Sequence, residues 1–184
     1  MPNSAPAAGV LLAAGAGIRY GMPKVLADQG GWLRSGVTAL HDGGCDDVVV
    51  VLGAAVVDVP IPGRAVIADD WADGLSASVR AGLRGIQDTP AEYAVLHTVD
   101  TPDVGADVIR RVLEAARSSS SGLARARYGD RPGHPVVIAR PHWPRLLELL
   151  CGDEGARPFL RDRTDVEPVQ CDDLASGRDV DSAR

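Results

Sequence analysis

The residues with the clearest chemical potential lie in a glycine-rich stretch, residues 15–24, that directly follows the apolar run 9–14. The stretch contains three glycines together with Arg19 and Lys24. Glycines allow a backbone to turn tightly and its N–H groups to approach a ligand, and such donors beside cations at a strand end are typical of phosphate sites. We therefore expect this loop to hold a polyphosphate. The alternative is a strand–helix turn with two solvated cations.

Lys24 is the only lysine of the chain, and arginine fills every other cationic position. An ammonium is a compact point charge whereas a guanidinium is a planar fork, so we expect Lys24 to face a phosphate. Two familiar phosphate loops do not match. The dinucleotide fingerprint would need a third glycine where Tyr20 stands, and neither Gly15 nor Gly17 has the spacing of a P-loop.

Acidic residues form two further candidate clusters. Asp100 follows the apolar run 94–99, so its carboxylate is expected at the carboxyl edge of the sheet, where open α/β folds bind ligands. A triphosphate arrives with Mg²⁺, which takes one or two carboxylates and keeps several waters. Asp179 and Asp181 alternate on a segment that we expect to be extended, so both face one side. Either Asp179 or Asp181 could supply a second metal contact. The alternative for Asp100 is a helix cap, and the alternative for the other two aspartates is an acidic tail.

Two serines, Ser76 and Ser78, are expected in the first turn of a helix that starts after Gly74. Hydroxyls and free N–H groups at such a turn can hold a base edge, a ribose or an anion. Ser78 is the first candidate contact and Ser76 the second. Capping of the helix by Gly74 or Ser76 explains part of the pattern but not all of it.

The composition describes one soluble globular domain, residues 1–184. Hydrophobic residues make up 45%, charged residues 24%, and the formal net charge is -6, which argues against nonspecific binding to nucleic acid or to an anionic membrane. The three cysteines are far apart, so we expect neither a metal cluster nor a disulfide framework, and a reducing cytoplasm. We expect no signal peptide and no membrane span.

The elements that must position these residues alternate along the chain, which predicts an α/β fold with a mostly parallel sheet and one antiparallel insertion. Strands are expected at 9–14, 48–52, 66–68, 94–99, 123–128, 135–138 and 166–170, and helices at 24–43, 75–86, 108–116, 141–150 and 156–161.

The string Leu-Ala-Ala-Gly-x-Gly-x-Arg-x-Gly-x-Pro-Lys, residues 12–24, resembles the signature loop of the MobA-like nucleotidyltransferases. Members of this family move a nucleotide monophosphate from an NTP onto a phosphorylated acceptor. Asp100-Thr101-Pro102 matches the family's Asp-x-Pro, whose aspartate is a metal ligand. Asp179-Val180-Asp181 matches the start of its Asp-Ile-Asp-Thr-Pro-Glu-Asp, and residues 182–184 depart from it.

Three other segments are similar to those of the molybdenum cofactor cytidylyltransferases. Residues 74–83 match Gly-x-Ser-x-Ser-x-Arg-x-Gly-Leu, while Gly133-His134-Pro135 and residues 152–157 are similar to strings in the acceptor-side half of the family. The resemblance implies that His134 is a substrate contact rather than a general base, and that Arg157 pairs with the acceptor phosphate. The alternative for His134 is a loop residue that shapes a pocket wall, and the alternative for Arg157 is a surface arginine.

The resemblance implies a Rossmann-like three-layer sandwich of the nucleotide-diphospho-sugar transferase type. It also implies a division of roles. The catalytic residues are Arg19, Lys24 and Asp100; the metal ligands are Asp100 and Asp181; the acceptor contacts are His134 and Arg157; the nucleotide contacts are Leu12, Ala13, Ala14, Gly15, Gly17, Arg19, Lys24, Gly74, Ser76 and Ser78.

The implied reaction is the Mg²⁺-dependent transfer of CMP from CTP to molybdopterin with release of pyrophosphate, and a molybdoenzyme or cofactor chaperone is a candidate partner. The Ala13-Ala14 pair is the form associated with CTP users, whereas GTP users tend to have Leu-Ala-Gly-Gly. Three alternatives stay open: an NADPH-dependent oxidoreductase of the same group, a non-catalytic cofactor-binding protein, and transfer to a sugar phosphate or alcohol phosphate. Relatives often have a larger residue at the position of Thr101, which keeps the non-catalytic cofactor-binding protein open.

Overall fold

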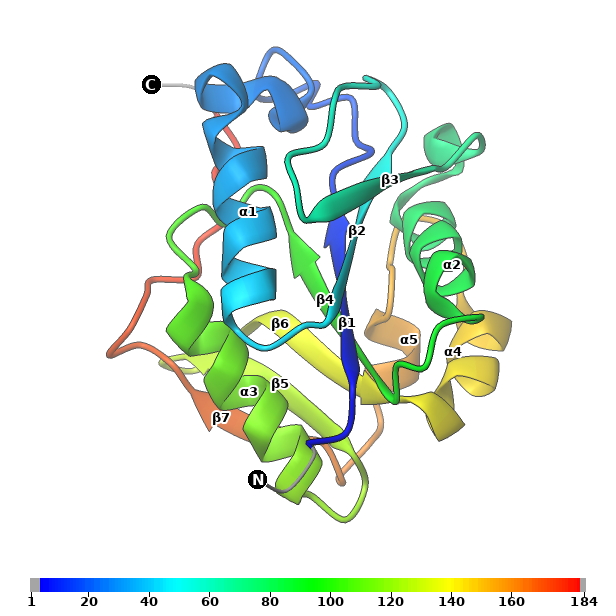
Figure 1. Ribbon diagram of the computed structural model, residues 1–184, viewed down its shortest axis with the longest axis vertical. Coiled ribbons are helices and arrows are strands. Elements are labelled where there is room, and N and C mark those ends of the chain that lie inside the picture. The colour runs from blue at the N-terminus through cyan, green and yellow to red at the C-terminus, as the bar shows by residue number, and fades with distance from the viewer. Residues whose placement is uncertain (1–3, 183–184) are drawn as a thin grey trace.

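The structure is a computed structural model that describes residues 4–182. Within them, one mixed sheet lies between two layers of helices (Figure 1). The strands are β1 (Ala7–Leu12), β2 (Asp47–Leu52), β3 (Gly63–Ile67), β4 (Tyr93–Thr98), β5 (Leu123–Tyr128), β6 (Arg131–Ala139) and β7 (Glu167–Gln170). The helices are α1 (Gly31–Asp42), α2 (Leu75–Ile86), α3 (Ala106–Ser118), α4 (Trp143–Leu149) and α5 (Arg157–Leu160), with 3-10 segments η1 (Lys24–Gly30), η2 (Trp71–Asp73) and η3 (Arg140–His142).

The strand order across the sheet is β3-β2-β1-β4-β6-β5-β7. The pairs β1–β2, β2–β3, β1–β4 and β5–β7 are parallel, whereas β6 runs antiparallel to both β4 and β5. This confirms the predicted α/β class with a mostly parallel, mixed sheet. The chain order reverses between β1 and β4, and a crevice at the carboxyl ends of strands is expected at such a point.

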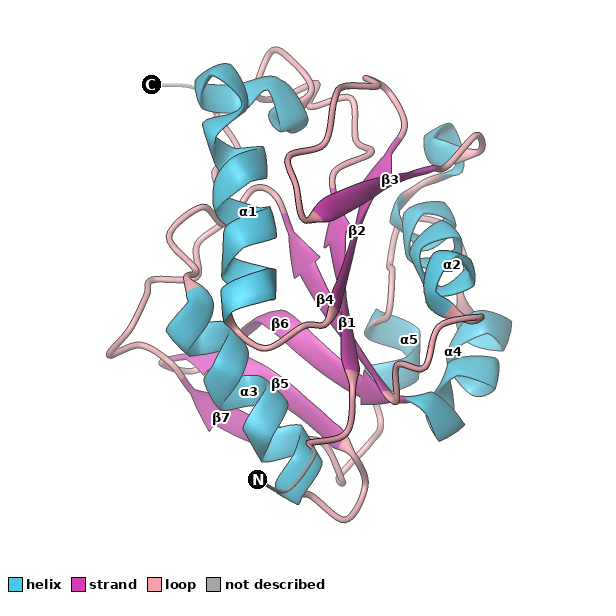
Figure 2. Cartoon of the chain, viewed as in Figure 1, coloured by secondary structure: helices cyan, strands magenta, loops and turns pink. Residues whose placement is uncertain are grey.

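Side chains from both faces of the sheet are buried, which explains why the central strands have nearly continuous apolar sequences. Residues of β1 alternate between the two faces. Leu11 packs with the apolar faces of α1 and α3, while Val10 and Leu12 pack with α2, α4 and α5. The two helical layers lie on opposite sides of the sheet in Figure 2.

Helix α2 lies very close to β1 because Gly82 has no side chain. A Cβ atom at Gly82 would lie 2.4 Å from Cγ1 of Val10, so a larger residue would push the helix away from the sheet. This close packing fixes how far Ser78, one turn earlier on the same helix, lies from the end of β1.

The single helix predicted over 24–43 is divided in the structure. The 3-10 segment η1 contains non-helical residues, with Asp28 and Gln29 at φ 51° and 50°, and α1 begins only at Gly31. The division falls at Gly30, which takes a left-handed conformation (φ 79°) that costs a glycine little.

The predicted antiparallel insertion is present as the pair β5–β6, but its second strand is longer than expected. β6 begins at Arg131 and not at residue 135, because Arg131 and Pro132 already pair with Tyr128 and Arg127 of β5. Among the described residues, no helix is long and apolar enough to cross a membrane.

Candidate functional site

A cleft of about 600 Å³ lies at the carboxyl ends of β1 and β4, where the strand order reverses. It collects residues from six separate segments of the chain. Of the predicted site residues, its walls contain Leu12, Ala13, Ala14, Gly15, Gly17, Arg19, Lys24, Gly74, Ser78, Asp100, His134, Arg157 and Asp181, together with Asp179. Ser76 is not among the residues that line it.

The loop after β1 is held at its base and turns on a glycine. The N–H of Ala13 donates to Val51 O over 3.0 Å. Further on, the N–H of Gly21 donates to Gly17 O over 2.8 Å. Gly17 has φ 62°, and a Cβ atom there would lie 1.9 Å from Met22 O, so this turn requires glycine. Gly15 faces open space, which leaves its backbone accessible from the cleft.

Lys24 joins the loop to both acidic segments. Its Nζ lies 3.0 Å from Oδ2 of Asp100 and 3.3 Å from Oδ1 of Asp181. The side chains of Lys24 and Asp100 are largely buried, with 16% and 24% of their surface exposed, so water screens this contact much less than it screens a surface pair. By contrast, Arg19 lies 3.7 Å from Asp181 with 83% of its side chain exposed, so it adds little to stability.

The C-terminal segment is fixed beside the end of β4 by the backbone. The N–H of Val180 donates to the carbonyl of Asp100 over 2.9 Å. Both Asp179 and Asp181 line the cleft on either side of this hydrogen bond.

The carboxylates of the cleft carry more negative charge than Lys24 offsets. Oδ1 of Asp100 is buried and has no hydrogen-bond partner among residues 4–182. Partial burial, followed by the charges of Asp100 and Asp181, raises the pKa of Asp179. An acceptor-only oxygen that is buried without a donor is a natural ligand for a hard cation. The donor set therefore fits a divalent metal ion.

Within the described chain, no three His, Cys, Asp or Glu side chains form a group that could hold a metal ion on their own. A divalent ion held by one or two of the cleft's carboxylates would need further oxygen ligands from water or from a bound molecule.

The first turn of α2 differs from the predicted one. Gly74 occupies the N-cap position, and the Ser76 side chain does not cap the helix. The N–H of Leu75 donates to Oδ1 of Asp153 over 3.0 Å, and the N–H of Ser76 donates to Gly152 O over 3.1 Å. The first two N–H groups of the helix are thus used by the loop over residues 152–153.

The two serines of this turn have different surroundings. The Ser76 hydroxyl donates to Cys151 O over 3.0 Å, which ties α2 to the end of α4. Ser78 is also buried, with 5% of its surface exposed, but it lines the cleft. Of the two serines, only Ser78 lines the cleft.

His134 lines the cleft from the first half of β6. Its backbone carbonyl accepts a hydrogen bond from the Tyr128 hydroxyl over 2.7 Å. Burial, reinforced by the positive charge of Arg125, lowers the pKa of His134 to about 4, against an opposing effect of Asp100. The imidazole is therefore neutral at pH 7 and can exchange hydrogen bonds without carrying charge.

Arg125, which sequence reasoning missed, does not itself line the cleft but contacts the segment that carries His134. It lies on β5 opposite Val136, and its Nε donates to Gly133 O over 3.2 Å. Burial and the nearby charge of Arg157 lower its pKa. The signal in the sequence was a charged residue between two alanines inside a predicted strand. The structure shows that both alanines, Ala124 and Ala126, are fully buried.

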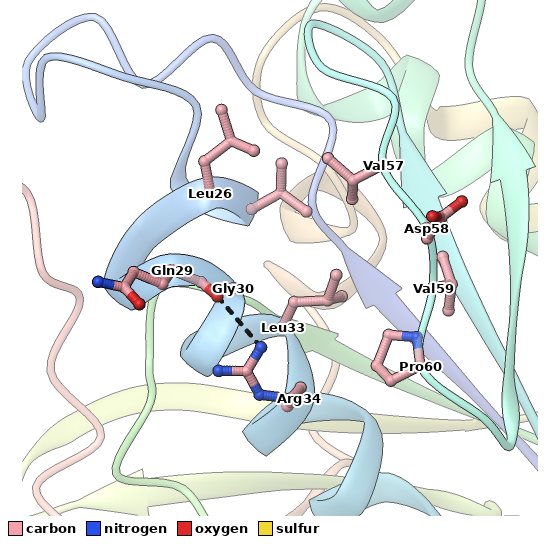
Figure 3. A pocket seen from close by; sticks show the side chains of 10 residues that line it. Leu26, Gln29, Gly30, Leu33, Arg34, Val57, Asp58, Val59 and Pro60 are labelled. Atoms are coloured by element: carbon pink, nitrogen blue, oxygen red, sulfur yellow. Dashed lines mark hydrogen bonds between the residues drawn. The ribbon is translucent and has the colours of Figure 1, made fainter.

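A second hollow, of about 400 Å³, lies between the region of η1 and α1 and the segment 57–60. Figure 3 shows Leu33, Val57 and Val59 around it, with Arg34 donating to Gln29 O over 3.1 Å. None of the predicted site residues lines this hollow, and its walls are mostly apolar.

The fold is a Rossmann-like α/β domain with a cleft at the switch point of its sheet. The MobA-like NTP transferase domain matches residues 9–168. The chain belongs to this nucleotidyltransferase family.

Three individual similarities accompany the family match. The nicotine blue oxidoreductase of Paenarthrobacter nicotinovorans is 35% identical over 188 residues, which cover 95% of this chain and 91% of that protein. The crystal structure of Rv0371c from Mycobacterium tuberculosis H37Rv is 26% identical, with a TM-score of 0.78 over 98% of this chain and 95% of that chain. A manganese complex of Rv0371C is 24% identical, with a TM-score of 0.68 over 90% of this chain and 88% of that one, and this last likeness concerns the fold alone.

Proposed function

We propose that the protein is a Mg²⁺-dependent nucleotidyltransferase that moves CMP from CTP to a phosphorylated acceptor and releases pyrophosphate, with molybdopterin as the candidate acceptor. The observation that carries this proposal is the contact of Lys24 with both Asp100 and Asp181. A single buried ammonium between two carboxylates, beside a glycine-rich loop, can serve a triphosphate and its metal ion together. The proposal places CTP along the loop and Mg²⁺ at the carboxylates.

The backbone of the loop and its cations would bind the triphosphate. Gly15 offers an accessible backbone, Lys24 a fixed charge, and Arg19 an exposed guanidinium that can close over a bound anion. Asp100, with Asp181 or Asp179, would hold Mg²⁺, which supplies Lewis-acid polarisation of the α-phosphate and an ordered geometry. An acceptor phosphate oxygen then attacks the α-phosphorus while the bond to the bridging oxygen of the β-phosphate breaks. Such chemistry depends on positioning and charge neutralisation rather than on a protein nucleophile.

The preference for cytosine rests on the Ala13-Ala14 pair and on Ser78. Ala13 and Ala14 are 5% and 3% exposed and line the cleft, so a base would lie against small, rigid side chains. Ser78, buried on the same wall, offers a hydroxyl that can donate to or accept from a base edge or a ribose. On the acceptor side, neutral His134 and cationic Arg157 are the proposed contacts.

The proposal is tested by a thermal-shift series against CTP, GTP and ATP, each with and without Mg²⁺, followed by an assay of pyrophosphate release with molybdopterin. We expect a CTP-selective shift that increases with Mg²⁺. Asp100→Asn should lose the Mg²⁺-dependent part and reduce turnover by about 10²–10³-fold, as is typical when one preorganised stabilising group is lost. Asp107→Asn is the matched control, because Asp107 forms an exposed ion pair with Arg110 on α3. An unchanged Asp100→Asn variant would exclude the assigned metal site.

A second candidate function, NADPH-dependent reduction, is supported by the 35% identity to a nicotine blue oxidoreductase. Hydride transfer does not need a pair of carboxylates at the phosphate loop, and this loop lacks the dinucleotide fingerprint. The same thermal-shift series with NADPH separates the two. A shift with NADPH but not with CTP favours the oxidoreductase, whereas a CTP shift without pyrophosphate release from any acceptor favours a cofactor-binding protein.

A further inference from the structure

Two arginines on the His134 side of the cleft have no paired carboxylate. Arg157 lines the cleft, and Arg125 contacts Gly133, the residue before His134. Neither forms an ion pair with an acidic side chain within residues 4–182. The acidic groups nearest to Arg157 in sequence are already engaged. Glu154 pairs with Arg161 over 2.7 Å, and Asp153 accepts the N–H of Leu75.

The backbone orients Arg125 toward the cleft-side face of the sheet. Arg125 pairs with Val136 across the β5–β6 ladder, and residues directly opposite in an antiparallel pair project to the same face. Val136 packs with Leu12 and Leu96, on the face covered by α2, α4 and α5. Arg125 therefore emerges on the side of the sheet where Leu12 and His134 line the cleft.

The guanidinium of Arg125 is held by one edge and free at the other. Its Nε donates to Gly133 O over 3.2 Å, which fixes the plane of the group and leaves both terminal nitrogens available. A guanidinium whose orientation is fixed loses little freedom when it binds an oxyanion through two parallel hydrogen bonds. Arg157 adds an exposed second cation at the first residue of α5.

Two neighbouring guanidinium groups repel each other, and the effect is stronger where water is partly excluded. Burial of Arg125, followed by the charge of Arg157, lowers the pKa of Arg125. A bound dianion would remove this repulsion, whereas a single carboxylate would offset only half of the charge. The chemical class that matches two arginines and a neutral imidazole is a phosphate monoester.

We propose that Arg125 and Arg157 together bind the phosphate monoester of the acceptor, at an anion site separate from the triphosphate site at Lys24. This inference rests on the transferase function proposed above. In that reaction two anions must approach each other, the acceptor phosphate and the α-phosphate of CTP. The arginine pair reduces their repulsion and selects a phosphorylated acceptor over a free alcohol.

The test measures binding of phenyl phosphate and of inorganic phosphate to the full chain by calorimetry at constant ionic strength. Arg125→Gln and Arg157→Gln should each raise the dissociation constant of phenyl phosphate by about tenfold or more, because each removes a charge-assisted hydrogen bond. Arg125→Lys should give an intermediate loss, since it keeps the charge but not the fork. Arg127→Gln is the matched control on the same strand, because Arg127 donates to Asp130 O in an exposed turn; it should leave the affinity unchanged.

Binding of CTP with Mg²⁺ is measured in parallel and separates this inference from the proposed function. Arg125→Gln should bind CTP as the unsubstituted protein does. If CTP does not bind the unsubstituted protein while phenyl phosphate binding depends on Arg125, the transferase function fails and the anion site stands. If CTP binds normally and neither glutamine variant weakens phenyl phosphate, the anion site is wrong. An equal loss in Arg127→Gln, or a matching loss of CTP affinity in Arg125→Gln, also overturns it. Arg157 is exposed, so Arg157→Gln decides the question if Arg125→Gln does not fold.

Discussion

Lys24 donates a hydrogen bond to Oδ2 of Asp100 over 3.0 Å, although 76 residues separate the two along the chain. The ammonium therefore occupies space between carboxylates that the proposed metal ion would also use. A cation at this position lowers the electrostatic cost of keeping Asp100 and Asp181 together. Metal ion and ammonium must then compete until a triphosphate draws Lys24 toward itself.

We expect Lys24→Met to bind Mn²⁺ about tenfold more tightly than the unsubstituted protein when no nucleotide is present, because the competing charge is gone. The same substitution should remove the increase in Mn²⁺ affinity that CTP produces in the unsubstituted protein. Electron paramagnetic resonance of free Mn²⁺ measures both effects. Arg34→Met, at a position outside the cleft, is the control. Unchanged Mn²⁺ affinity in Lys24→Met would contradict competition at the carboxylates.

Gly17→Ala should disrupt the loop while the core stays folded. An alanine at φ 62° costs about 1–2 kcal/mol, and its Cβ would meet Met22 O at 1.9 Å, so the loop must rearrange. CTP affinity should fall by at least about tenfold with little change in Tm, measured by calorimetry and thermal melting. Gly105→Ala is the control, since a Cβ there meets nothing within 4 Å. Normal CTP binding by Gly17→Ala would show that this turn does not shape the site.

Asp179→Asn should slightly stabilise the metal-free protein at pH 7. Partial burial and the charges of Asp100 and Asp181 raise the pKa of Asp179 in the folded state, so its ionised form weakens the fold at every pH above that pKa. Because the carboxylate is only partly buried and water screens its charge, we expect Tm to rise by no more than about 2 °C. The difference should disappear as the pH falls below the unfolded-state pKa of 3.8. A gain that persists at pH 3 would point to another cause.

His97 should make the fold sensitive to mild acid. It is 1% exposed, its Nδ1 has no hydrogen-bond partner in the described structure, and burial followed by the charge of His134 lowers its pKa from 6.5 to about 3. The unfolded chain takes up a proton below pH 6.5 whereas the folded chain resists it, so stability falls as the pH drops toward 3. At pH 5 this loss amounts to about 2 kcal/mol.

His97→Leu should abolish that part of the pH dependence. Between pH 7 and pH 5 the unsubstituted protein should lose about 2 kcal/mol of unfolding free energy that the variant does not lose. Urea denaturation at each pH measures this difference. His41→Gln, on the exposed face near the end of α1, is the control. Parallel pH profiles for His97→Leu and the unsubstituted protein would rule out this origin of acid sensitivity.

Local patterns in the sequence were sufficient to predict the strands of the sheet and to single out most of the residues that line the cleft. The central strands were recognisable because burial on both faces leaves continuous apolar runs, as in residues 48–52. The glycine-rich loop was recognisable because its glycines and Lys24 are contiguous in the chain. The irregular segment η1 was less predictable, because the left-handed residues Asp28 and Gln29 are not types that mark such a turn strongly.

The amino-acid sequence shows which groups are available: a glycine-rich loop with two cations, an aspartate at a strand end and an acidic pair near the C-terminus. Which of them meet depends on the tertiary fold. The fold joins Lys24 to Asp100 and Asp181, ties the Ser76 hydroxyl to Cys151, and sets Arg125 against Gly133. These contacts link residues far apart along the chain, so their geometry depends on how strands and helices pack, which no local pattern of residues specifies.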